Sequence, residues 1–238
     1  MIKTVWLDNP PVNAVNRVII DTLWTELEGL GDKVRAVVLR GRGDRAFSAG
    51  ADIAGFQGDG DAGGRPAGIQ PVADLIESTP VPVVAAIHGY CLGGGLEIAL
   101  ACDLRIAHAD AQLGFPEVNL GLLPGGGGTQ RAPRLISPGR AQWLIMSGER
   151  IPAEQSAEWG LVEFVVDDLE EGIARYVEPL DKQSPHAVRQ IKSLLRETRE
   201  ERSDEREIEA FVACLNSEDG QEGVAAFLEK RPANWTGR

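Results

Sequence analysis

Cysteine, histidine and long apolar runs are all scarce in this 238-residue chain. The chain has three cysteines, Cys91, Cys102 and Cys214, and no C-x-x-C motif. An odd number of cysteines without such a motif is typical of reduced thiols in a cytosolic protein. The opening residues lack the apolar segment of a signal peptide. No apolar run reaches the roughly 18 residues of a membrane span. We therefore expect a cytoplasmic protein without a membrane partner.

Positive charge is also in short supply, with 24 Lys and Arg against 36 Asp and Glu and a formal net charge of -12. Nucleic acids and anionic membranes attract basic surfaces, so this balance argues against both as partners. A small anionic ligand remains compatible with it, because such a ligand needs only a local cationic patch. The length suits one hydrophobic core with a smaller appended part.

Several catalytic motifs are absent. The chain contains no G-x-S-x-G nucleophile elbow, no H-E-x-x-H zinc motif and no G-x-x-x-x-G-K-[ST] phosphate loop. The histidines, His88, His108 and His186, fit structural or surface roles better than metal ligation, and no Cys/His spacing indicates a metal site. We therefore expect no metal.

Apolar residues predict strands that alternate with helices. IKTVWL, VRAVVLRG, VPVVAAIHG and LRIAHA are typical of strands, and LEIALAC, between the last two, is typical of a short buried helix. Asn16 can cap an earlier helix. The apolar positions of that helix recur at spacings of three and four: Ile19, Ile20, Leu23, Leu27 and Leu30. Alternating strands and helices imply an α/β core.

Beyond residue 137 the chain becomes helical and charged. The Ser-Pro pairs at 137–138 and 184–185 each combine an N-cap with a proline in the first helical position. Three helices are predicted after the second pair, with narrow apolar faces: Val188, Ile191 and Leu195; Ile208, Phe211, Val212 and Leu215; Val224, Phe227 and Leu228. Such faces must pack on the core or on a partner subunit. We divide the chain into a core, 1–183, and a helical region, 184–238.

Glycine is abundant and concentrated. Residues 55–70, GFQGDGDAGGRPAGIQ, have little apolar content and predict a mobile surface loop. Three other glycine-rich segments follow strand-like runs: AFSAGADI at 46–53, HGYCLGGGLEIAL at 88–100 and FPEVNLGLLPGGGGTQR at 115–131. In the second, Gly93–Gly95 stand where the first N–H groups of a helix lack an internal partner. Such groups bind a phosphate or a developing oxyanion, although a tight turn explains the spacing equally well.

Two acids accompany these glycines. Glu97 falls in the first turn of the short helix among apolar neighbours, where a carboxylate is costly unless it is partnered or protonated. It can also simply stabilise the helix N-terminus. Glu117 follows Phe115-Pro116 in a predicted loop, where a solvated acid is the usual case. If both faced one cavity they could share general acid/base work, but their spacing does not show that they meet.

The three glycine-rich segments together resemble the signature blocks of the enoyl-CoA hydratase/isomerase (crotonase) family. The resemblance rests on AFSAGADI, GYCLGGGLEIALACDLRIA and FPEVNLGLLPGGGGTQR, in that order, and it extends to PPVNAVN and to the terminal AFLEKRPANW. It implies an α/β fold, a spiral of ββα units followed by C-terminal helices that build a trimer, or a hexamer of two trimers. It also implies a hydro-lyase of fatty acid metabolism that acts on an acyl-CoA thioester. Coenzyme A is then part of the substrate, and no separate cofactor is expected.

The resemblance also assigns roles to residues. The N–H groups of Ala51 and Gly94 would hold the thioester carbonyl, and Glu97 and Glu117 would add water across the 2,3 double bond. Glu117 would deliver the proton to C2 while Glu97 helps to activate the water. Further substrate-binding positions are implied, with Gly125 placing the water through its backbone: Ala14, Ala49, Asp52, Ile53, Leu92, Gly93, Pro116 and Gly125. More weakly, Phe227 and Lys230 match positions that reach a neighbouring subunit's site.

The chain departs from the family pattern in two features, one of which is the Gly/Asp-rich loop at 55–70 that replaces a more ordinary helical stretch. Many relatives carry a lysine soon after GADI that meets the CoA phosphates, whereas this chain has Ala54 and Gly55 there. Hydration of a trans-2-enoyl-CoA is the leading hypothesis. A double-bond isomerase on the same scaffold is the nearest alternative, because isomerases generally need one acid. The alternative from another class is a non-catalytic acyl-CoA-binding protein.

Overall fold

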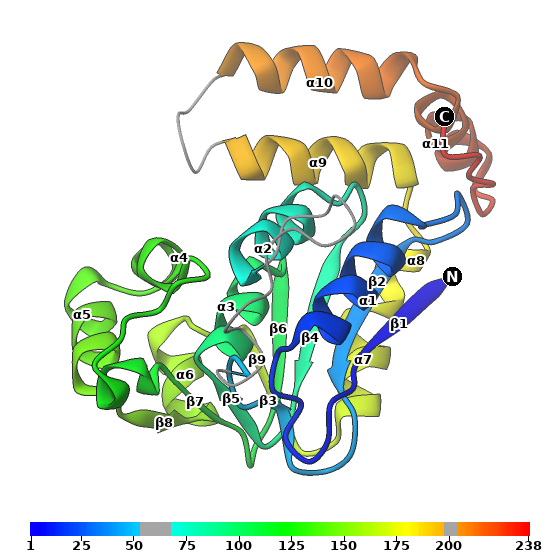
Figure 1. Cartoon of the computed structure of the whole chain (residues 1–238). Helices are drawn as coiled ribbons and strands as arrows, with labels where there is room; N and C mark the ends of the chain where they lie inside the picture. The colour runs from blue at the N-terminus through cyan, green and yellow to red at the C-terminus, as the bar shows by residue number, and fades with distance from the viewer. Residues whose placement is uncertain (53–67, 198–203) are drawn as a thin grey trace.

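The computed structural model describes residues 1–52, 68–197 and 204–238. Within these residues five strands form a parallel sheet in the spatial order β1-β2-β4-β6-β9 (Figure 1). Their bounds are Ile2–Leu7 (β1), Ala36–Gly41 (β2), Val83–Ile87 (β4), Leu104–His108 (β6) and Phe164–Val166 (β9). The first four coincide with the apolar runs from which strands were predicted, so those predictions are confirmed.

A second sheet of the described chain contains four short strands in the order β3-β5-β7-β8. Their bounds are Ala46–Ser48 (β3), Tyr90–Leu92 (β5), Gln112–Gly114 (β7) and Arg150–Pro152 (β8). The first three run parallel, and β8 is antiparallel to β7. Three residues are too few to show an alternating pattern, and for that reason the sequence did not predict these strands.

From β2 to β7, consecutive strands alternate between the two sheets. β2, β4 and β6 belong to the first sheet, and the strand that follows each of them, β3, β5 or β7, belongs to the second. Helix α2 (Ile69–Ser78) comes after β3 and α3 (Gly94–Ala101) after β5, while β7 leads into the 3-10 helix η1 (Pro116–Leu120) and then α4 (Gly128–Leu135). This repetition is the predicted spiral of ββα units. The other helices are α1 (Arg17–Glu28), α5 (Pro138–Ser147), α6 (Ala153–Trp159), α7 (Leu169–Tyr176), α8 (Glu178–Asp181), α9 (Pro185–Glu197), α10 (Asp204–Asn216) and α11 (Glu218–Glu229).

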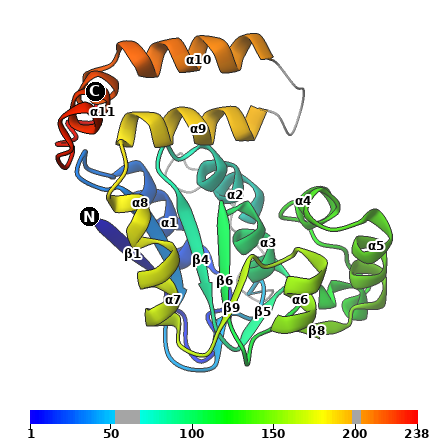
Figure 2. The same cartoon turned by 180° about the vertical axis from the view of Figure 1, so that it is seen from behind.

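The first sheet is buried on both faces. Because side chains alternate along a strand, Val37, Leu39 and Val83 pack into the large core with α1, α2 and α3, whereas Val38 and Val84 pack on the other face against α7. Figure 2 shows α7 and α8 on that second face. Burial on both faces explains why these strands are continuous apolar runs in the sequence.

The structure confirms the predicted N-caps of three helices. The side chain of Asn16 accepts a hydrogen bond from the N–H of Ile19 at 3.1 Å, and Ser137 and Ser184 cap α5 and α9 in the same way. One boundary differs: α1 ends at Glu28, so Leu30 lies beyond the helix, partly buried against the core.

Helix α2 was not predicted. Most of the segment expected to be a loop, 55–70, lies outside the described residues, but its last two residues open α2, so the prediction is wrong there. The helix buries an apolar face against the core: Ile69, Val72, Ala73 and Ile76. The preceding glycines masked this pattern in the sequence.

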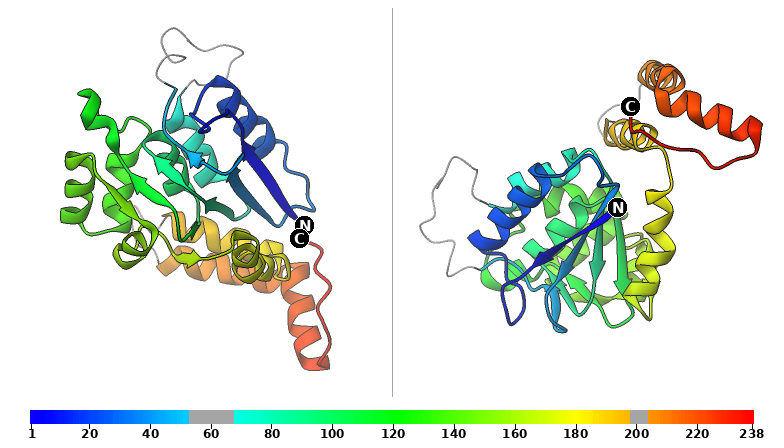
Figure 3. Two further views of the ribbon diagram at one scale, coloured as in Figure 1. Left: turned by 90° about the horizontal axis from the view of Figure 1, so that it is seen from below. Right: turned by 90° about the vertical axis from the view of Figure 1, so that its right-hand side faces the viewer.

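The C-terminal helices extend from the core, as Figures 1 and 3 show. Lys192 of α9 anchors the first of them, because its Nζ donates to the carbonyls of Val81 (3.0 Å) and Ile76 (3.3 Å) and pairs with Asp103 at 2.7 Å. α10 lies along α9 and α11 follows it. No helix in the described part of the chain is long and apolar enough to cross a membrane.

Candidate active site

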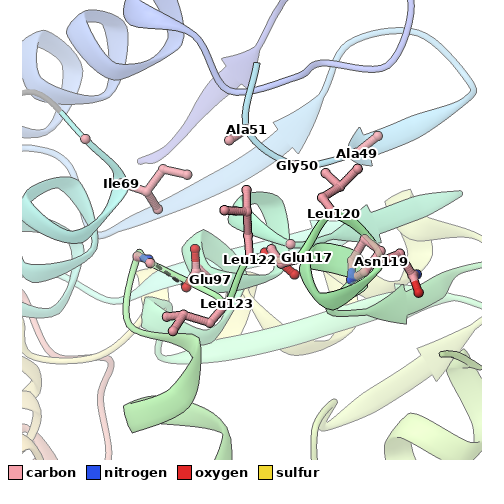
Figure 4. Close-up of a pocket in the computed structure, with 16 residues that line it drawn as sticks. Ala49, Gly50, Ala51, Ile69, Glu97, Glu117, Asn119, Leu120, Leu122 and Leu123 are labelled. Atoms are coloured by element: carbon pink, nitrogen blue, oxygen red, sulfur yellow. Dashed lines mark hydrogen bonds between the residues drawn. The ribbon is translucent and has the colours of Figure 1, made fainter. Parts of the chain in front are cut away.

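Elements from successive ββα units meet at one cavity of about 480 Å³. The segment after β3 supplies Ala51, the turn after β5 supplies Gly94, and α3 and η1 supply Glu97 and Glu117. The loop before α4 closes the cavity. Figure 4 shows the lining residues: Ala49, Gly50, Ala51, Gly68, Ile69, Gly93, Gly94, Glu97, Pro116, Glu117, Asn119, Leu120, Leu122, Leu123, Gly125 and Gly126. Residues 46 positions apart in the chain, Ala51 and Glu97, thus line the same cavity.

Two backbone N–H groups at this cavity are available to donate hydrogen bonds to a ligand. Val15 pairs with the segment around Ala51 through the carbonyl of Gly50 and the N–H of Asp52, so the N–H of Ala51 points away from Val15. Gly94 is the first residue of α3, where an N–H has no partner within the helix. Among the described residues neither N–H donates to a protein acceptor. A Cβ built on Gly94 would lie 3.4 Å from the nitrogen of Ala51, so the two groups are close enough to share one oxygen ligand.

Gly94 also contacts a residue that the sequence did not single out. A Cβ at this position would overlap Cδ1 of Ile69, the first residue of α2. The glycine therefore leaves space that the tip of Ile69 fills, in addition to the space expected for a thioester.

Glu97 is 2% exposed, and backbone donors hold its carboxylate. Its Oε1 accepts hydrogen bonds from the N–H groups of Gly126 (2.7 Å) and Gly128 (2.8 Å). Burial raises its pKa, and the two N–H groups and the positive charge of Arg131 oppose that rise. A Cβ on Gly126 would come within 2.5 Å of Glu97 Oε2, so glycine is required for this approach. The cost of burying this acid is therefore offset by the glycine loop and not by solvent.

Glu117 has the opposite surroundings. It lies in η1 and not in an irregular loop, and its Oε2 is buried without a hydrogen-bond partner in the described structure. Burial, together with the nearby charge of Glu97, raises its pKa to about 7. A Cβ on Gly93 would approach Glu117 Oε1 within 2.6 Å. The cavity thus pairs one hydrogen-bonded acid with one acid that holds a proton near neutral pH.

The whole chain, residues 1–238, matches the family model described as enoyl-CoA hydratase/isomerase. The chain belongs to this family. A probable enoyl-CoA hydratase of Bacillus subtilis is 40% identical, over 97% of this chain and 93% of that protein. A crotonyl-CoA hydratase of Syntrophomonas wolfei is 39% identical, over 94% and 90%. The crystal structure of an enoyl-CoA hydratase from Bacillus anthracis has a TM-score of 0.90 at 36% identity, over 100% of this chain and 96% of that one.

Only part of the predicted substrate site of this hydratase/isomerase family member lines the cavity. Ala49, Gly93, Pro116 and Gly125 lie on it with the two acids and the two N–H groups. Three other predicted positions are not among the lining residues: Ala14, Asp52 and Leu92. The contact of Lys230 with a neighbouring subunit's site stays a prediction. Ile53 lies outside the described residues, as does the side chain of Phe227. In the described ranges no group of three or more His, Cys, Asp and Glu side chains is arranged to hold a metal ion.

Several lining residues of this family member were not predicted. Leu120, Leu122 and Leu123 are 62%, 55% and 69% exposed at the cavity, and Asn119 lies beside them. Their signal in the sequence is a group of leucines inside a Gly- and Pro-rich segment, where no buried helix or strand accounts for them. An apolar wall of this kind suits the acyl part of a thioester.

The raised pKa of Glu117 predicts a pH-dependent gain in stability for Glu117→Gln. The folded chain keeps the proton to about pH 7, whereas the unfolded chain loses it near the ordinary value of 4.5. Stability therefore falls as the pH rises through this window, and a glutamine, which cannot ionise, avoids the loss. We expect the Tm of the variant, measured relative to the unsubstituted protein, to rise between pH 5 and pH 8. Glu158→Gln, on the exposed surface, controls for the loss of one charge. A Tm difference that stays constant over this range would contradict the prediction.

Proposed function

We propose that this chain hydrates trans-2-enoyl-CoA thioesters to 3-hydroxyacyl-CoA. The observation that carries the proposal is the cavity that holds two acids with different environments, the buried Glu97 and the partly buried Glu117, together with two N–H groups that donate to no acceptor among the described residues. The hydratase names of relatives at about 40% identity support the same reaction.

Each group has a step suited to its surroundings. The N–H groups of Ala51 and Gly94 bind the thioester oxygen and stabilise the negative charge that develops on it. Glu97 accepts a proton from water as the oxygen of that water bonds to C3. Glu117, protonated near neutral pH, gives its proton to C2. One water is consumed, the double bond becomes single, and the proton gained by Glu97 must return to Glu117 through solvent.

The test is turnover of short, medium and long trans-2-enoyl-CoAs. Loss of the absorbance of the conjugated thioester reports the reaction, and mass spectrometry with chromatography identifies the product. A 3-hydroxyacyl-CoA supports the proposal. A 3-enoyl-CoA would instead make the chain a double-bond isomerase, and calorimetric binding without turnover would make it an acyl-CoA-binding protein.

We also propose that the C-terminal helices assemble the chain into a trimer, or into a hexamer of two trimers. Large apolar side chains of α9 and α10 are exposed in the single chain: Ile191 (55%), Leu195 (63%), Ile208 (64%), Phe211 (67%) and Val212 (47%). Exposed large apolar side chains in this number on two neighbouring helices are typical of an interface.

Assembly predicts that Ile208→Glu/Phe211→Glu lowers the particle mass. Light scattering should give three or six times 25.6 kDa for the parent chain and a smaller species for the double variant, because two charges would have to be buried at the interface. Val18→Glu, at a 63%-exposed position on α1, is the control and should leave the mass unchanged. A parent chain that is monomeric at micromolar concentration would contradict the proposal.

A further inference from the structure

We propose that Arg131 is a positioning residue for Glu97 and acts through the backbone of Gly126. The inference rests on the proposed hydration, in which Glu97 handles the water, and it adds a residue to that machinery. Arg131 belongs to α4 and does not line the cavity. It acts on the reaction through the donors that hold the carboxylate, through helix α2 and through its own charge, and not by contact with the substrate.

Arg131 is 7% exposed, and its guanidinium is engaged on three sides. Nη1 donates to the carbonyl of Gly126 at 3.0 Å. Nε and Nη2 form a bidentate pair with Glu77, at 3.1 and 2.9 Å, and Nη2 also bonds to Asp74 at 2.8 Å. A planar guanidinium with several fixed donors suits this geometry, which an ammonium group cannot reproduce in full. Arg131 therefore holds Gly126 at a set distance from α2.

Gly126 transmits this constraint to Glu97. Its carbonyl accepts from Arg131, and its N–H donates to Glu97 Oε1, the atom that also accepts from Gly128. Between the two donors lies Gly127, at a φ of 103°, and a Cβ there would overlap Arg131 Nη1. The guanidinium thus packs against the turn of Gly126–Gly128, and the N–H groups at the two ends of this turn donate to Glu97.

The same guanidinium also fixes one wall of the cavity. Asp74 and Glu77 are one turn apart on α2, and the first residue of that helix is Ile69, which touches the positions of Gly94 and Gly126. Arg131 consequently ties together the donors of Glu97 and the helix that borders the oxyanion N–H groups. Misplacement of a reacting group by about 1 Å can cost about 10²-fold in rate, so loosening this tie should slow the reaction.

Charge adds a second, separable effect. The charged groups that face Glu97 are Glu117 from η1 and Arg131 from α4, and Asp74 and Glu77 from α2 partly balance Arg131. The positive charge lowers the pKa of Glu97, so its removal raises that pKa. Because Glu97 works ionised, the acidic limb of the rate profile then moves to higher pH. The two acids interact, so this limb belongs to the pair.

A merely structural role would give different results, and the chain offers a matched control. Arg105 is 2% exposed and donates to the carbonyls of Leu161 (2.9 Å), Cys102 (2.8 Å) and Ala99 (3.3 Å) while pairing with Glu163. It is a buried arginine with the same kinds of partner, and none of these partners lines the cavity. Arg105→Lys measures what loss of a buried guanidinium does to folding alone.

The experiment compares Arg131→Lys, which keeps the charge, Arg131→Gln, which removes it, and Arg105→Lys. We expect Arg131→Lys to lower kcat on the best trans-2-enoyl-CoA by about 10- to 100-fold, with KM and the calorimetric Kd for a saturated acyl-CoA within about threefold. Arg131→Gln should also move the acidic limb of kcat to higher pH. Arg105→Lys should lower Tm while leaving kcat and the pH profile unchanged.

A second readout does not need turnover. The carboxyl ¹³C signal of labelled Glu97, assigned by its loss in Glu97→Gln, is followed against pH in the substrate-free proteins. It should titrate at higher pH in Arg131→Gln than in the parent chain, and Glu77→Gln gives a milder perturbation if Arg131→Gln does not fold. An unchanged titration, or kcat losses that match those of Arg105→Lys at equal loss of Tm, would overturn the proposal. If the parent chain hydrates no enoyl-CoA while the titration still moves, the proposed hydration fails and the effect of Arg131 on the pKa of Glu97 stands.

Discussion

Glu117→Gln and Glu97→Gln are each expected to lower hydration by at least about 10²-fold, the lower end of the effect of a general acid or base. A glutamine at 117 carries no transferable carboxyl proton, and a glutamine at 97 cannot take a proton from water. The amide oxygen that Glu97→Gln introduces can still accept from Gly126 and Gly128, so the new side chain should keep the place of the old one. Binding should therefore change little.

The measurement pairs kcat on the best trans-2-enoyl-CoA with calorimetric binding of a saturated acyl-CoA. Glu158→Gln, on the surface of α6, serves as the matched control for the same chemical change. Near-parental turnover in either active-site variant would remove that glutamate from the mechanism.

Gly94→Val is expected to reduce kcat by about 10²- to 10³-fold, the loss typical of one oxyanion donor. No side-chain change can delete the N–H itself, so the effect must come from displacement. The first added carbon would lie 3.4 Å from the nitrogen of Ala51, and the branched carbons would extend into the space between the two donors. Because charge develops on the oxygen only during reaction, binding of a saturated acyl-CoA should weaken much less.

Because Gly94 lies against Ile69, the experiment needs a second variant as a control. The added carbon also overlaps the tip of Ile69, so a loss of rate could arise from movement of α2. Gly94→Val/Ile69→Ala removes this overlap and leaves the obstruction between the donors. We expect the double variant to remain as slow as Gly94→Val, after circular dichroism has established that both are folded. Recovery of turnover in the double variant, or equal losses in binding and kcat, would exclude the oxyanion role.

Local signals in the sequence predicted much of the fold. The caps Asn16, Ser137 and Ser184 and the buried strands depend on neighbours within a few residues, or on burial of both faces of a sheet, and both leave a pattern in a single chain. The three-residue strands of the second sheet leave none, because they are too short to show an alternating pattern.

The sequence likewise predicted some residues of the candidate site and missed others. Its glycines and acids stand in recognisable segments, whereas Ile69 and Arg131 acquire their positions from contacts across long stretches of chain. Arg131 meets Asp74 at a separation of 57 residues, and in the sequence it is one arginine among many charges. Whether Glu117 is buried could not be predicted either, because its surroundings come from Gly93 and Glu97 on another unit of the spiral.

The strands of the second sheet fix distances across the cavity, because backbone pairing holds them at a constant spacing. β3, β5 and β7 are hydrogen-bonded neighbours, and adjacent strands stand about 4.8 Å apart. The donor pair lies past the ends of β3 and β5, and the acids come from the segments after β5 and β7. The offset between the donor pair and the two acids is therefore set by backbone pairing in the sheet. Loops between the units lie outside this pairing, so a change in their length or composition leaves the spacing of the strands unaltered.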